Sequence, residues 1–131
     1  MKIIHASGKR KRAIARATLK PGKGIIRINH VMLDHFQPKL SRLKLREPLL
    51  LAGAVADKVN INVNVKGGGY TSQADASRLA IARALVKFDK KLEDTFLKYD
   101  RHLIIADVRR KEASKPNRHG QARAKRQKSY R

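Results

Sequence analysis

The chain has 131 residues, with 32 Lys and Arg against 10 Asp and Glu, a formal net charge of +22. Leu, Ile, Val and Phe supply about a quarter of the residues, enough for a folded core, whereas an isolated domain this basic would repel itself and therefore indicates a polyanionic partner: nucleic acid first, an anionic membrane second. The absence of Cys excludes disulfides and thiolate metal sites, and no apolar run is long enough to span a bilayer.

Cations dominate the N-terminal segment, and strands are predicted after it. Residues 1–20 carry seven Lys or Arg and no acid, and four of these cations are consecutive from Lys9 to Arg12. We interpret this run as a phosphate-binding edge, with a solvated strand end as the alternative. Residues 13–19 and 25–31 read as two strands joined by a tight reversal at 20–24, because Pro and Gly favour turns there. Asn29-His30 suits a further turn, since both residue types tolerate positive φ.

The middle of the chain predicts one helix and one clear strand. Residues 33–47 suggest short helical pieces around Pro38. Pro48 suits the first turn of a helix that ends near Ala56. Residues 59–65 alternate strictly between apolar side chains and Asn, which predicts a strand with one apolar face.

A glycine triplet, residues 67–69, ends that strand and precedes a predicted helix. Ser72 and Asp75 suit a capping box for a helix reaching about Phe88, with a small-residue ridge at Ala76, Ala80 and Ala84. The triplet could form an anion-binding nest or simply a tight turn. It lacks the Gly-Lys-Ser/Thr ending of a nucleotide-binding P-loop. A shorter helix over 91–99 and a strand over 102–106 follow.

The last segment, residues 109–131, has ten Lys or Arg, only Glu112 as an acid, and no Leu, Ile, Val, Phe or Met. Such a segment cannot bury enough apolar surface to offset the entropy of ordering. We therefore predict a globular domain over residues 1–108 and an extended basic tail over 109–131 that is ordered only against a partner. A solubility tail or a localisation signal is the alternative.

The sequence offers no enzymatic or metal-binding constellation. The five His residues lack metal-ligand spacing, and the carboxylates are scattered without a nucleophile and base that could act together. We expect no cofactor, no metal, no small-molecule substrate and no membrane association, because the tail lacks the bulky apolar face of a membrane-surface helix. A soluble intracellular protein is expected, since the N-terminus lacks the apolar region of a secretory signal.

In chain order, these motifs resemble those of the small-ribosomal-subunit protein nine family, called protein sixteen in eukaryotes. The most specific match is the glycine triplet followed by Tyr70-Thr71-Ser72-Gln73-Ala74-Asp75 and the small-residue helix to Leu85. The run from Gly8 to Arg16 resembles the N-terminal motif of the family. Residues 47–53 and 127–131 resemble its archaeal and eukaryotic branch. His30 and Val108 depart from residues common in the family, at a hairpin turn and at the base of the tail.

The resemblance implies an α+β fold shared with the C-terminal domain of small-subunit protein five. This fold has a mixed sheet with helices packed on one face and a left-handed βαβ crossover. It also implies a structural, non-enzymatic role in translation in the cytoplasm, bound to ribosomal RNA in the head of the small subunit. Proteins seven, ten and fourteen of that subunit are the implied neighbours.

Charge pattern and resemblance together predict the functional residues. The resemblance alone implies that the tail reaches the anticodon arm of P-site tRNA with Lys128, Tyr130 and Arg131. The expected rRNA-binding residues are Lys9, Arg10, Lys11, Arg12, Arg16, Gly67, Gly68, Gly69, Arg78, Arg83, Arg109, Arg110, Lys111, Lys115, Arg118, Arg123, Lys125 and Arg126. A free RNA-binding protein on a related fold, such as an RNA chaperone or the protein part of an RNA-processing enzyme, is the main rival.

Overall fold

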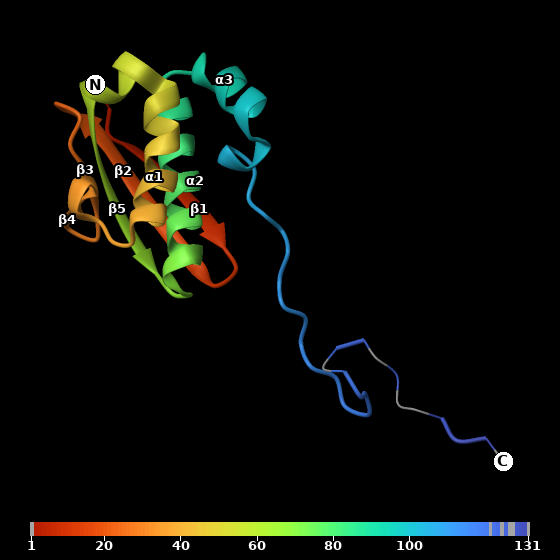
Figure 1. Ribbon diagram of the computed structural model, residues 1–131. Coiled ribbons are helices and arrows are strands. Elements are labelled where there is room, and N and C mark those ends of the chain that lie inside the picture. The colour runs from red at the N-terminus through yellow and green to blue at the C-terminus, as the bar shows by residue number, and fades with distance from the viewer. Residues whose placement is uncertain (1, 121, 124, 126–127, 131) are drawn as a thin grey trace.

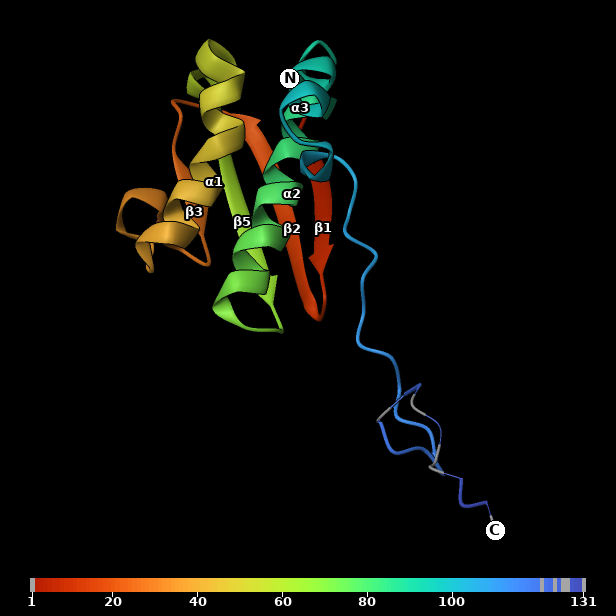
Figure 2. The same ribbon diagram turned by 45° about the vertical axis from the view of Figure 1, so that its right-hand side comes forward.

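The computed structural model describes residues 2–120, 122–123, 125 and 128–130. In this part of the chain a mixed sheet is covered on one face by helices α1 and α2 (Figures 1 and 2). The strand order across the sheet is β1-β2-β5-β3-β4, antiparallel except for the parallel pair β3–β5. The elements are β1 (Ile4–Arg10), β2 (Ala13–Pro21), β3 (Ile26–Ile28), β4 (Val31–Met32), α1 (Lys39–Ala52), β5 (Val59–Lys66), α2 (Tyr70–Phe88) and α3 (Leu92–Tyr99), with 3-10 turns at Leu33–His35, Gly53–Lys58 and Arg101–Leu103.

The predicted α+β class, with helices on one face of a mixed sheet, is confirmed. The alternation in β5 has the expected effect, because its Val and Ile side chains are buried against the helices while Asn62 and Asn64 are exposed on the other face. The small-residue ridge of α2 is also confirmed: Ala76, Ala80 and Ala84 are fully buried. The handedness of the crossover from β3 to β5 stays a prediction.

Close packing of α2 on the sheet depends on a glycine in β1. A Cβ atom added at Gly8 would lie 2.3 Å from the carbonyl oxygen of Ala76 and 2.8 Å from the backbone nitrogen of Ala80. The helix backbone therefore approaches the strand as closely as it does only because both sides lack bulk. Gly8 therefore serves the packing of helix on sheet.

The predicted reversal between residues 19 and 25 does not form a hairpin. β5 lies between β2 and β3 and pairs with both. The connecting loop instead closes on the start of β5, where the backbone N–H of Gly22 donates to Lys58 O at 3.0 Å. The predicted turn at Asn29-His30 is confirmed, with both residues at positive φ between β3 and β4.

Three further local predictions are wrong for identifiable reasons. Pro48 lies inside α1, not in a first turn, because the buried positions Ser41, Leu45, Pro48 and Ala52 form one continuous helix face. Ser72 is not a helix cap: α2 begins at Tyr70, with Gly69 as its N-cap. Residues 101–103 form a 3-10 turn in place of the predicted strand.

Asp100 explains why residues 101–103 form a 3-10 turn and not a strand. Its side chain accepts a hydrogen bond from His102 N at 2.9 Å, and the turn buries Leu103 completely. The helix over 91–99 is otherwise confirmed as α3.

Candidate nucleic-acid interface

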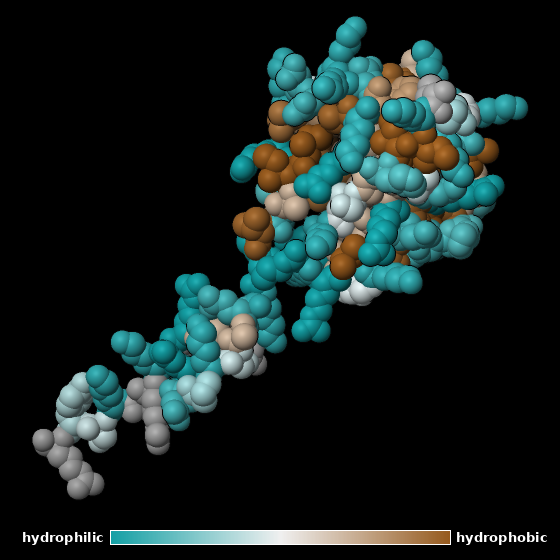
Figure 3. Space-filling model, turned by 180° about the vertical axis from the view of Figure 1, so that it is seen from behind, coloured by the Kyte–Doolittle hydropathy of each residue, from teal (hydrophilic) through white to brown (hydrophobic). Residues whose placement is uncertain are grey.

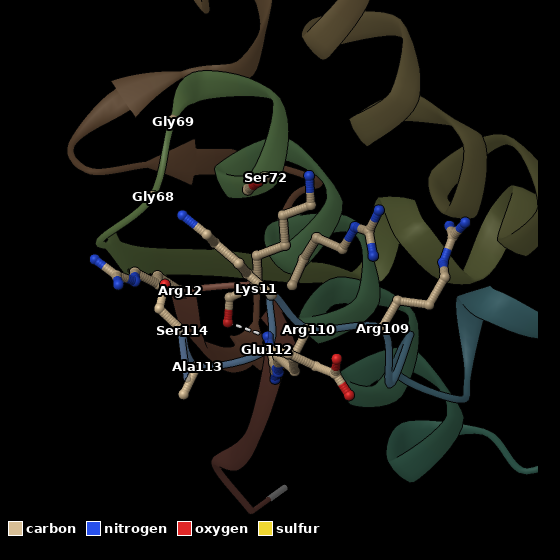
Figure 4. A pocket seen from close by; sticks show the side chains of 12 residues that line it. Lys11, Arg12, Gly68, Gly69, Ser72, Arg109, Arg110, Glu112, Ala113 and Ser114 are labelled. Carbon is tan, nitrogen blue, oxygen red and sulfur yellow. Dashed lines mark hydrogen bonds between the residues drawn. The ribbon is translucent and has the colours of Figure 1, made fainter. Parts of the chain in front are cut away.

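A basic groove forms where three segments distant in the sequence meet. The segments are the β1–β2 turn, the loop before α2 and the first residues after 108, and together they enclose about 1070 Å³. Figure 4 shows Gly68, Gly69 and Ser72 on one side, the tail on the other, and Lys11 and Arg12 between them. Glu112 is the one acid in the lining of this groove, against six cations: Arg10, Lys11, Arg12, Arg109, Arg110 and Lys111. We call this site the basic groove.

The tight β1–β2 turn carries two of these cations into solvent. The register pairs Arg10 with Ala13, so only Lys11 and Arg12 connect the strands, and both are exposed. The turn rests on the glycine triplet, because a Cβ atom at Gly67 would lie 2.6 Å from Arg12 O. Gly67 also has a φ of 80°, which a side chain would disfavour. The triplet therefore brings the N-terminus of α2 beside the turn.

The N-terminus of α2 adds backbone donors to the groove. Gly69 is its N-cap and offers no side-chain acceptor to the first N–H groups, and the first turn contains no acid. Such an end is electropositive and favours anions. Gln73 stabilises the loop, since its side chain donates to Gly67 O at 3.2 Å. The nest and the tight turn that the sequence offered as alternatives are compatible in this geometry.

Asp107 holds the base of the tail against β1. Its carboxylate lies 2.6 Å from Arg10 Nη1 and accepts hydrogen bonds from the backbone and side chain of Arg109. Arg110 Nη1 donates to Lys11 O, across the groove. The hydrogen bonds from Arg109, its side chain first, and the nearby charge of Arg10 lower the pKa of Asp107 far below its usual value. The tail therefore leaves the body beside the hairpin turn.

Replacing Asp107 with Asn should loosen residues 108–114 without opening the sheet. Backbone ¹⁵N relaxation of these residues is the measurement, with Glu112→Gln as the control, since that change breaks only the pair with Arg123. Because the folded pKa is depressed, the Asp107 contact is complete above the usual carboxyl range and is lost only on strong acidification. Relaxation should therefore be constant from about pH 8 to pH 5. Equal mobility in both variants would contradict this role.

Beyond the groove the tail runs away from the body (Figure 1). It is bent as well as extended. Arg123 forms two hydrogen bonds with Glu112, at 2.7 and 2.8 Å, and the backbones at Arg118 and Lys125 pair in an isolated antiparallel β-bridge. Lys115, Arg118, Arg123 and Lys125 are exposed, as are Lys128 and Tyr130. Arg126 and Arg131 lie outside the described residues.

Two predicted RNA-binding residues on α2 have partners within the protein. Arg78 Nη2 lies 2.5 Å from Glu47 and 3.1 Å from Asp100, which ties α1 and the 101–103 turn to α2. Arg83 donates to Ile104 O at 2.9 Å and to Ser7 O at 3.0 Å. The structure thus gives both side chains a role in holding elements together. Lys9 and Arg16 are exposed on the face of the sheet that is turned away from the helices, outside the groove.

Comparison with known proteins identifies the family. The model of the family described as ribosomal protein S9/S16 matches residues 8–131. The chain belongs to this family. It is 49% identical to small ribosomal subunit protein uS9 of Methanococcus maripaludis strain C7, over 134 residues and the full length of both chains. Identity to the protein of the same name from Methanococcus vannielii is 48%, again over both full lengths.

Membership in the S9/S16 family confirms the resemblance seen in the motifs, including its archaeal-type branch. The S9/S16 family is one of structural, non-enzymatic proteins of the small ribosomal subunit, which act in translation in the cytoplasm. Within the described residues, no group of three or more His, Asp or Glu side chains could hold a metal ion. No helix in that part of the chain is long and apolar enough to cross a membrane.

Sequence reasoning missed two residues of the site. Gln73 was noted only as part of a motif, and its contact with Gly67 gives that motif a physical reason. Asp107 was not singled out. Its position two residues before Arg109 is a local signal, because an Asp side chain readily accepts from the backbone two residues on.

Proposed function

We propose that this S9/S16-family chain binds small-subunit ribosomal RNA through the basic groove and the tail, and that the end of the tail reaches P-site tRNA. The observation that carries the proposal is the convergence of six cations and the α2 N-terminus on one groove, from which the tail emerges. Cations of this kind neutralise phosphates, and backbone N–H groups at a helix end receive phosphate oxygens. In this proposal the bound rRNA lies in the head of the small subunit, beside proteins seven, ten and fourteen.

The free cations of the groove give the sharpest test of rRNA binding. Lys11, Arg12 and Lys111 are exposed, and their side chains form no hydrogen bond or ion pair with any described residue. We define a groove variant, Lys11→Gln/Arg12→Gln/Lys111→Gln. The matched control, the α3 variant Lys90→Gln/Lys91→Gln/Lys98→Gln, removes the same charge from exposed positions near the far end of α2.

Affinity for a transcript of the small-subunit head RNA should fall roughly 10–100-fold in the groove variant at about 0.15 M salt. The slope of log affinity against log salt should become shallower by about 2, since each lost phosphate contact contributes about 0.7–0.9. Filter binding or fluorescence anisotropy at several salt concentrations measures both. If the groove and α3 variants lose affinity equally, only overall charge matters and the groove is not the site.

The tRNA assignment rests on family resemblance and on reach. A fully stretched segment of 23 residues spans about 75–80 Å. Lys128 and Tyr130 are exposed near its end and free to contact another molecule. Arg131→Ala should therefore weaken retention of P-site tRNA while subunits still assemble. Occupancy of tRNA on purified small subunits at moderate salt is the measurement, and unchanged occupancy would refute the assignment.

The proposal also separates this chain from a free RNA-binding protein on a related fold. A structural constituent should sediment with small subunits in stoichiometric amount when cell extract is fractionated. A free RNA chaperone should remain largely at the top of the gradient.

A further inference from the structure

The two faces of the sheet differ sharply in charge. None of the strands β1 to β5 contains Asp or Glu. The face turned away from the helices carries five exposed cations, Lys9, Arg16, Lys20, Arg27 and Lys66. Within the part of the chain that the structure describes, none of these side chains forms a hydrogen bond or an ion pair. We call this surface, with its Asn residues, the open sheet face.

The helical side of the protein is balanced by comparison. Asp34 pairs with Arg46 at 2.7 Å, Asp75 with Lys44 at 3.2 Å, and Glu47 with Arg78 at 2.5 Å. The open sheet face therefore carries five cations and no acid on its strands, whereas acids offset part of the positive charge on the helical side. Like charges fixed on a rigid surface repel one another, and a bound anion removes this cost.

Strand register aligns the polar groups of the open sheet face in rows. One row joins Ser7, Arg16 and Asn64, and the next joins His5, Thr18, Asn62 and Arg27. A third row, Lys9, Ile14 and Lys66, lies at the end of the sheet near the basic groove. From residue 14 to residue 20 and across four strands, this face measures about 20 Å by about 14 Å. Figure 3 views the molecule from behind, where hydrophilic side chains are interspersed with several hydrophobic patches.

We propose that the open sheet face is a second RNA-binding surface, which takes the backbone and shallow minor groove of a double-helical RNA segment. This inference rests on the proposed function and adds a surface apart from the groove and tail. The body would then lie between two RNA segments, one at each surface.

The chemistry of the face favours paired over unpaired RNA. No Phe, Tyr or Trp points outward from these strands, so unpaired bases would have no aromatic platform on which to stack. His5 is tied to Thr18 Oγ1 at 3.3 Å. Asn62 and Asn64 are exposed, and an amide both donates and accepts, as does a ribose 2′-hydroxyl. A-form RNA displays these hydroxyls across a wide, shallow minor groove that suits a flat surface.

A protein partner fits the face less well. Apart from Ile14, Ile25 and Met32 the outward positions of the strands are polar or basic. The buried centre of a protein–protein interface is normally depleted of Lys and rich in apolar or aromatic groups.

The test uses a sheet variant, Arg16→Gln/Lys20→Gln/Arg27→Gln, compared with the groove and α3 variants, all in the full chain. The probes are an RNA duplex of about 16 base pairs and a poly(U) strand. The sheet variant should lose duplex affinity roughly 10-fold or more relative to the α3 variant, with a salt slope shallower by about 2. Its affinity for poly(U) should match that of the α3 variant. Circular dichroism checks that each variant is folded.

Three outcomes would overturn the inference. If the sheet and α3 variants bind the duplex equally, the open sheet face is not an RNA surface. If the groove variant loses affinity but the sheet variant does not, the proposed function stands without this second surface. If neither the groove variant nor the sheet variant differs from the α3 variant, both proposals fail. Equal losses on duplex and poly(U) would refute the preference for paired RNA.

A photocrosslinker at position 62 gives an independent reading in assembled small subunits. Crosslinks from this position to RNA would support the assignment. Crosslinks to a neighbouring protein in place of RNA would overturn it.

Discussion

Replacing Gly8 with Ala should lower the free energy of unfolding by about 2–3 kcal/mol. The new methyl group would lie 2.3 Å from Ala76 O and 2.8 Å from Ala80 N, both of them helix backbone atoms that no rotamer change can move. α2 would have to shift away from β1, which loosens the buried contacts on both sides of the helix. Urea unfolding followed by circular dichroism measures the change, and the melting temperature should fall by roughly 10 °C.

Gly69→Ala is the matched control for this prediction. A Cβ atom at Gly69 meets nothing within 4 Å, and its φ of −93° suits any residue. Ala is a weaker N-cap residue than Gly, and this is the only expected cost, so the free energy of unfolding should fall by less than about 1 kcal/mol. Similar losses at positions 8 and 69 would show that the close approach of helix and strand is not what the glycine provides.

Removing residues 109–131 should reduce affinity for head-domain RNA by at least about 10³-fold at about 0.15 M salt. The tail carries ten cations and one acid, and about half of these cations in contact with phosphates would account for this loss. The salt slope should become shallower by about 4. Electrophoretic mobility shifts over a salt series measure both quantities.

The same truncation should leave the body folded. Leu103 is the last residue of the buried core, and the tail has no Leu, Ile, Val, Phe or Met to contribute. Removing only residues 124–131 should have even less effect on unfolding. A clearly lower melting temperature in the shorter truncation would mean that the end of the tail packs on the body, contrary to the exposure of Lys125 and residues 128–130 in this structure.

Residues whose pattern is local could be predicted from the sequence. The strict alternation at 59–65 and the small-residue ridge of α2 each reflect one element packed on one neighbour. The basic ends were likewise visible as charge. Predictions failed where the outcome depends on contacts beyond the local sequence. Pro48 lies inside α1 because it continues a buried helix face that begins at Ser41. The strands β2 and β3 are consecutive in the chain, but β5 lies between them in the sheet.

The candidate site shows the same limit. The sequence identified cations at 9–12 and 109–111 and the glycine triplet, but not that they form one groove. Their meeting depends on the pairing of β2 with both β1 and β5, and on Asp107. Arg78 and Arg83 illustrate the converse. Glu47 lies 31 residues before Arg78, so no local pattern could show that this cation already has a partner.

Anchoring the tail at the hairpin turn has a consequence for the order of ribosome assembly. Because Asp107 and Arg110 hold its first residues beside the groove, RNA captured by the body would already lie within reach of the rest of the tail. Joining two binding modules through a short connection makes the second encounter intramolecular, at an effective concentration in about the millimolar range. Individually weak contacts along the tail would then form only after the body has docked. A free chain would have little tendency to thread into the wrong RNA.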